Sequence, residues 1–173
     1  LQGNNDVDIG TAPTTISAAH ANSIHRGITE GSGEYICVCD IDIAFLNEWT
    51  GQVLPLLNEV AFVSHRWEGM YQIARPQFMV FKRKWFEDNN LVFSANHKDT
   101  GGVLTKFCSE NNFEYIIIPN SYNEPGLKQN HILKEITNGE QAFGRDGKPF
   151  IFHHGRGTLS GGRNTRGDWY EIL

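Results

Sequence analysis

Apolar residues occur along the chain in two kinds of pattern, one typical of helices and one typical of strands, and the two kinds alternate. Helical spacing of apolar side chains runs through residues 16–30, and compact apolar runs at 34–41 and 113–120 are typical of strands buried in a sheet. Further strands are predicted at 7–10, 60–64, 77–86 (running into a short helix) and 149–158. Further helices are predicted after Asn47, as an N-cap, and at 99–112 and 129–137. Strands alternating with helices predict an α/β fold, with a mostly parallel sheet flanked by helices.

The length and the composition fit one domain. The chain has 173 residues, of which 39% are hydrophobic, and a chain of this size buries about 70% of its unfolded surface. Residues 161–173 are polar and read as a tail. The sequence therefore predicts a single domain over residues 1–160.

Charge and cysteine content restrict the location and the partners. The net charge of -5 argues against a nucleic-acid binder that relies on a broad basic face. No apolar run approaches the roughly 18 residues that a membrane span needs, and the first ten residues lack the features of a leader. Three cysteines, Cys37, Cys39 and Cys108, are a poor disulfide framework and are interpreted as reduced core thiols. A cytoplasmic location is predicted.

Two aspartates end the most apolar strand, in "GEYICVCDID". Asp40 and Asp42 would share a face if the strand continued, with Cα atoms roughly 7 Å apart. Carboxylates this close repel each other, and a hard divalent cation would remove the repulsion. Two alternatives stay open: a solvated or capping pair, and a phosphatase of the haloacid dehalogenase type in which Asp40 is the nucleophile and Asp42 the acid/base.

Four stretches together resemble GT-A glycosyltransferases, close to family 2. "GITEGSGEYICVCDIDIAFLNEW" is similar to the family's strand with its D-x-D motif, and "ARPQFMVFKRKWF" to the segment that lines the sugar pocket. "KDTGGVLTKF" resembles the acidic helix start, and "FIFHHGRGT" the late histidine segment. The resemblance covers about residues 14–160 and implies metal-dependent, inverting transfer of a sugar from a nucleotide-diphosphate sugar to a hydroxyl of a saccharide or another acceptor.

The resemblance also implies roles for the residues that match these motifs. Asp42 would bind Mn²⁺ or Mg²⁺ directly, with Asp40 beside it near the metal or the donor ribose. His153 or His154 would add a ligand, and since neighbours on a strand point to opposite faces, only one of them can. Asp99 would be the general base, or otherwise a plain helix cap.

Further residues are candidates for contacts with the donor. Arg156 would neutralise the diphosphate, and His20, Gln77 and Trp67 would lie near the donor, although a helix-surface histidine and a core tryptophan are the competing readings for His20 and Trp67. His65 reads as part of a loop that could contact a sugar ring.

The resemblance implies an opening strand–helix–strand segment that holds the nucleotide base, and the chain is expected to start after it. We therefore expect a partial domain, whose uncovered sheet surface would favour self-association. The alternative function is a non-catalytic remnant that binds a carbohydrate or a partner.

Overall fold

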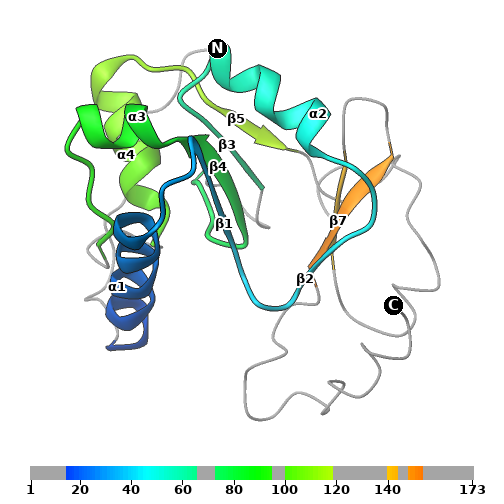
Figure 1. Ribbon diagram of the computed structural model, residues 1–173, viewed down its shortest axis with the longest axis horizontal. Coiled ribbons are helices and arrows are strands. Elements are labelled where there is room, and N and C mark those ends of the chain that lie inside the picture. Colours follow the sequence, from blue (N-terminus) through cyan, green and yellow to red (C-terminus); the bar gives the residue numbers. More distant parts are fainter. Residues whose placement is uncertain (1–14, 66–72, 95–99, 119–139, 144–147, 154–173) are drawn as a thin grey trace.

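The computed structural model describes residues 15–65, 73–94, 100–118, 140–143 and 148–153 (Figure 1). Its helices are α1 (Thr15–Glu30), α2 (Thr50–Val53), the 3₁₀ helix η1 (Leu54–Asn58), α3 (Arg83–Asp88) and α4 (Gly102–Asn111). Its strands are β1 (Tyr35–Cys39), β2 (Ile43–Phe45), β3 (Phe62–His65), β4 (Phe78–Lys82), β5 (Ile116–Ile118), β6 (Glu140–Phe143) and β7 (Pro149–His153).

The strands form two sheets. The first has the order β1-β4-β3-β5 and the second the order β2-β7-β6. In the first sheet β1, β3 and β5 run in one direction, and β4 lies reversed between β1 and β3. The predicted α/β class is confirmed. The prediction of a mostly parallel sheet does not hold for the hydrogen-bonded pairs, because the reversed β4 makes two of the three pairs antiparallel.

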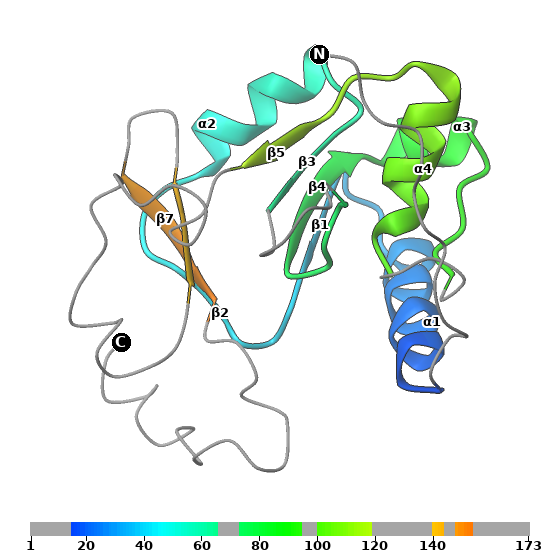
Figure 2. The ribbon, with the colours of Figure 1, turned by 180° about the vertical axis from the view of Figure 1, so that it is seen from behind.

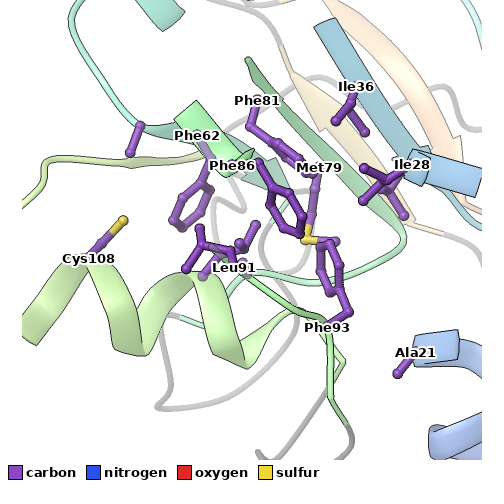
Figure 3. Close-up of a cluster of buried hydrophobic side chains, with 14 residues drawn as sticks. Ala21, Ile28, Ile36, Phe62, Met79, Phe81, Phe86, Leu91, Phe93 and Cys108 are labelled. Atoms are coloured by element: carbon purple, nitrogen blue, oxygen red, sulfur yellow. The ribbon is translucent and has the colours of Figure 1, made fainter. Parts of the chain in front are cut away.

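Helices α1, α3 and α4 lie together on one side of the first sheet, and β2 and β7 lie on the other, in both views (Figures 1 and 2). The helical side buries a cluster to which β4 contributes Met79 and Phe81, and Phe81 stacks on Phe86 of α3 with ring centroids 5.3 Å apart (Figure 3). The opposite face buries Phe78 and Val80 against α2, η1 and β7. This alternation along β4 is what a strand covered on both faces requires.

Local contacts explain where the first helix and sheet meet. The Arg83 guanidinium donates from Nη1 to the Ile28 carbonyl oxygen (2.6 Å) and from Nε to the Gly33 carbonyl oxygen (2.7 Å). Carbonyls at the end of a helix lack partners within the helix, so a cation there satisfies them. Arg83 therefore joins the end of α1 to the start of α3.

Several predicted elements are shorter than the apolar pattern suggested. The helix after Asn47 starts at Thr50 and continues as η1, which has Pro55 in its first turn, and Asn47 instead donates to the Pro149 carbonyl oxygen. The strand predicted at 34–41 ends at Cys39. Predictions at 7–10, 129–137 and 161–173 lie outside the described residues.

The cysteine prediction is half right. Cys108 is buried in α4, but Cys37 and Cys39 are exposed. Both lie on β1, which pairs with β4 and has no second partner among the described strands. The strand was expected to be covered on both faces. Cys37 and Cys39 pair in register with Val80 and Phe78 and share their face of the sheet, but among the described residues the elements that bury this face at β4 do not bury these two residues of β1. Among the described residues, no helix combines the length and the apolar character needed to cross a membrane.

Candidate functional site

Asp40 and Asp42 lie in a turn between the two sheets. Asp40 follows the last residue of β1, Asp42 precedes the first residue of β2, and Ile41 between them is 92% exposed. The Asp40 backbone N–H donates to the Gln77 carbonyl oxygen at 3.3 Å, which extends the pairing of β1 with β4 by one residue. The chain then leaves the first sheet, so the two carboxylates converge through a turn and not along one strand.

His153 completes a compact group with the two aspartates. It is the last residue of β7, where it pairs in register with Ile43 of β2. Its Nε2 lies 3.4 Å from Asp42 Oδ1 and 3.8 Å from Asp40 Oδ2. Pairing of β2 with β7 therefore brings residues more than a hundred positions apart in sequence to the same point.

The three residues could hold a cation. Among the described residues, Asp40, Asp42 and His153 each offer one ligand atom, and these three atoms lie within 4.8 Å of one another. The side chain of His153 is 5% exposed, that of Asp42 14% and that of Asp40 26%. Partial burial strengthens the interaction of these donors with a positive charge, and the exposed side of Asp40 leaves an approach from solvent.

His20 lies on the other side of Asp40. This α1 histidine has its Nε2 3.8 Å from Asp40 Oδ1, and its Nδ1 3.5 Å from the hydroxyl of Thr100. Thr100 is 2% exposed and lies two residues before the first residue of α4. The two oxygens of Asp40 thus face two different histidines, His20 and His153.

The start of α4 packs closely against β4 and the segment that precedes it. A Cβ atom on Gly101 would come within 2.3 Å of the Ala74 carbonyl oxygen and 2.9 Å of the Met79 sulfur, so no larger residue fits there. One turn later, the Thr105 hydroxyl accepts a hydrogen bond of 2.7 Å from the Ala74 backbone N–H. These contacts fix Thr100 relative to the first sheet.

His65 was expected in a loop, and this is wrong: it is the last residue of β3 and is fully buried. Its ring meets the His153 ring edge to face, with centroids 6.5 Å apart. His65 therefore belongs to the surroundings of the candidate site. The sequence signal was available, since a histidine at the carboxyl end of a buried strand lies at the sheet edge where ligands bind in α/β proteins.

Gln77 is also part of this edge. It is 9% exposed and directly precedes β4, opposite Asp40. Its side-chain oxygen is buried, and among the described residues no donor is assigned to it. A buried acceptor of this kind is available to a ligand or a water molecule. The predicted contact of Gln77 with a donor stays a prediction.

Cys39 is the residue next to Asp40 and has an unusual acidity. A hydrogen bond from the Cys37 thiol lowers the pKa of Cys39 to about 7, although partial burial and the charge of Asp40 act in the opposite direction. The same interaction is the largest cause that raises the pKa of Cys37. Cys39 is thus the more acidic thiol of the pair.

The structure brings together Asp40, Asp42, His153 and His20 of the predicted site residues, with Gln77 adjoining them. The other predicted residues, Asp99, Trp67, His154 and Arg156, lie outside the described residues. Comparisons of the chain with protein-family models, with curated proteins and with solved structures find no match. The group of Asp40, Asp42 and His153 is the feature of the described residues that bears on function.

Proposed function

We propose that the protein is a metal-dependent glycosyltransferase that moves a sugar from a nucleotide-diphosphate sugar to an acceptor hydroxyl, with inversion. The observation that carries the proposal is the convergence of Asp40, Asp42 and His153 beyond the end of β1. A D-x-D turn with a distant histidine is also what the resemblance to GT-A enzymes implies. The fold itself supports the proposal only at the level of an α/β sheet flanked by helices.

The donor set suits a divalent cation. Two carboxylate oxygens and one imidazole nitrogen are ligands that Mn²⁺ accepts, and Mg²⁺ accepts the carboxylates. Three protein ligands leave coordination positions for the oxygens of a substrate. The two carboxylates lie near each other, and a cation bound between them relieves their repulsion.

The chemistry is divided between the two sides of the reacting sugar. A divalent cation bound to Asp42, Asp40 and His153 would supply stabilisation of the negative charge on the departing diphosphate. His153 must be deprotonated at Nε2 to act as a ligand. Arg156, from its position in the sequence, would add a positive charge on the same side.

Asp99 would activate the acceptor. It directly precedes Thr100 in the sequence, and as general base it would accept the proton of an acceptor hydroxyl that comes within hydrogen-bond reach. The acceptor oxygen then forms its bond to the anomeric carbon while the bond from that carbon to the diphosphate breaks. Displacement in line inverts the anomeric centre, the proton ends on Asp99, and the diphosphate leaves with the electron pair.

A first experiment tests the metal site. In Mn²⁺ titrations followed by electron paramagnetic resonance, Asp42→Asn is expected to weaken binding by more than about 100-fold, above the range typical of changes outside the ligand shell. Asp88→Asn is the matched control, because Asp88 pairs with Lys84 on the surface of α3. Equal Mn²⁺ binding by the wild type and Asp42→Asn would contradict the proposal.

A second experiment tests turnover. The protein is incubated with Mn²⁺ and a panel of nucleotide-diphosphate sugars, and release of the free nucleoside diphosphate is measured with and without saccharide acceptors. Release that needs both the metal and Asp99 is the expected result. Binding of Mn²⁺ and donor without release from any of the panel would favour the non-catalytic, carbohydrate-binding alternative.

A further inference from the structure

We propose that His20 is a positioning residue that sets the orientation of the Asp40 carboxylate, and that Thr100 fixes the tautomer of His20. The three residues form a chain of contacts from the start of α4, through α1, to the candidate metal ligand Asp40. This inference rests on the proposed function only in that Asp40 binds the cation. It assigns His20 a role other than contact with the donor.

Asp40 lies in a turn, where the backbone alone does not set the direction of its side chain. Its backbone is anchored by the hydrogen bond to Gln77, but a carboxylate rotates freely about its last bond unless its oxygens are held. Oδ2 faces His153 on the cation side, and Oδ1 faces His20 on the opposite side. Holding Oδ1 therefore directs Oδ2 toward the position that a cation would take.

The tautomer of His20 follows from the groups that it faces. An ionised carboxylate only accepts hydrogen bonds, so the Nε2 that faces Asp40 must carry a proton in order to bind it. In the neutral ring Nδ1 is then an acceptor, and the hydroxyl of Thr100 is the group positioned to donate to it. The contact between Nε2 and Oδ1, at 3.8 Å, is longer than a hydrogen bond and acts as an electrostatic contact.

Thr100 is a suitable anchor because it cannot move easily. It is 2% exposed, and the neighbouring Gly101 packs directly on the Ala74 backbone and the Met79 sulfur. His20 itself is more open, with 38% of its side chain exposed. Without the hydroxyl of Thr100, the His20 ring would have no fixed tautomer from this side.

The first test measures Mn²⁺ affinity by electron paramagnetic resonance. His20→Phe keeps a ring but removes both nitrogens, and it is expected to weaken Mn²⁺ binding by about 10- to 100-fold, as loss of a partner of a metal ligand does. His20→Gln retains an amide donor and should recover most of the affinity. His25→Phe is the matched control, since His25 lies on the same helix about 1.4 turns further along.

A double-mutant comparison isolates the contact with Thr100. Thr100→Val removes the hydroxyl with little change of volume and should weaken Mn²⁺ binding by less than His20→Phe. Because the hydroxyl acts through His20, His20→Phe with Thr100→Val should bind no more weakly than His20→Phe alone. If the two substitutions lowered the Mn²⁺ affinity additively, Thr100 would not act through His20, and this part of the proposal would be wrong.

The tautomer is measured directly in the metal-free protein. Long-range proton–nitrogen spectra at pH 8, where an ordinary histidine is neutral, should show the His20 proton on Nε2 in the wild type and a mixture of tautomers in Thr100→Val. A wild-type proton on Nδ1 would overturn the proposal.

The outcomes separate this inference from the proposed function. If the wild type and His20→Phe bind Mn²⁺ equally while Asp42→Asn does not bind it, the positioning role is wrong and the metal site stands. If the wild type itself binds no Mn²⁺, the metal site is wrong and the positioning role falls with it.

Discussion

The two sheets that meet at the candidate site are supported very differently. The central strands β3 and β4 of the first sheet are packed on both faces, and Phe62, Phe78 and Phe81 are fully buried in them. The second sheet pairs β2 with β7 over three residues, and among the described residues one of its buried clusters consists of Ala44 and Phe152, with Leu46 beside them. Asp40 is anchored to the first sheet, whereas Asp42 and His153 belong to the second.

The positions of Asp40 and Asp42, which are separated by one residue, are thus set by two different sheets. The geometry of the group requires that β2 and β7 keep their register, since Ile43 pairs with His153. It also requires that the second sheet stay docked on the first through Phe150 and Ile151. A cation bound to Asp40 and Asp42 would link the sheets, and metal binding would stabilise the folded state by mass action.

The largest effect on this comparison is expected from truncating one core aromatic in each sheet. Phe81→Ala removes contacts with Trp85, Phe86 and Phe93 and should lower the free energy of unfolding by about 3–5 kcal/mol. Phe152→Ala should lower the free energy of unfolding by less, because the described part of its cluster, Ala44 and Leu46, is small and can collapse more readily around the cavity. Urea unfolding followed by circular dichroism measures both.

Hydrogen exchange distinguishes a local from a global effect of these truncations. Phe152→Ala should speed exchange in β2 and β7 while leaving β3 and β4 protected, as expected for a separately opening unit. Equal losses of protection in both sheets would show that the molecule opens as one unit and would contradict separate opening of the second sheet.

A smaller effect is expected where α4 meets the first sheet. Gly101→Ala would place a methyl group against the Ala74 backbone, and overpacking of this kind should lower the free energy of unfolding by about 1–3 kcal/mol. Gly27→Ala is the control of opposite sign: nothing lies within 4 Å of its Cβ position in α1, so it should stabilise the protein by about 0.5–1 kcal/mol. Two substitutions with the same sign in urea unfolding would contradict this reading of the Gly101 contact.

The sequence predicted much of the first sheet because its strands are locally recognisable. Continuous apolar runs identified β1, β3 and β5, and the alternation of helices between them identified the α/β class. It could not give the direction of β4, because an apolar strand reads the same whether it is parallel or antiparallel to its neighbours. It also predicted buried thiols at Cys37 and Cys39, since an apolar run does not reveal how far the elements that pack on each face of the sheet extend over the strand.

The candidate site was predictable in part for the same reason. Asp40 and Asp42 are signalled by their position after a strand, and His153 by a histidine at the end of another. The contact of Thr100 with His20 and of His65 with His153 joins residues far apart in sequence, and depends on how α4 and β3 pack. Local patterns do not contain that information.

The smallest effect concerns Cys39, an exposed residue at the end of β1. Its pKa of about 7 means that the thiolate, which is the reactive form, is half populated near neutral pH, while burial raises the pKa of Cys108 to about 12. Alkylation by iodoacetamide, followed by mass spectrometry across pH, should therefore modify Cys39 with a midpoint near pH 7 and leave Cys108 unmodified. In Cys37→Ala the midpoint should rise, because the hydrogen bond that favours the Cys39 thiolate is lost.

The alkylation of Cys39 also reports on the charge of Asp40, although Cys39 is not itself one of the candidate metal ligands. The negative charge of Asp40 raises the pKa of Cys39, so neutralising that charge should lower it. Saturating Mn²⁺ is therefore expected to move the alkylation midpoint of Cys39 to lower pH, and Asp40→Asn should move it in the same direction without metal. A midpoint that Asp40→Asn shifts and Mn²⁺ does not would mean that the cation is held by the second sheet alone, through Asp42 and His153.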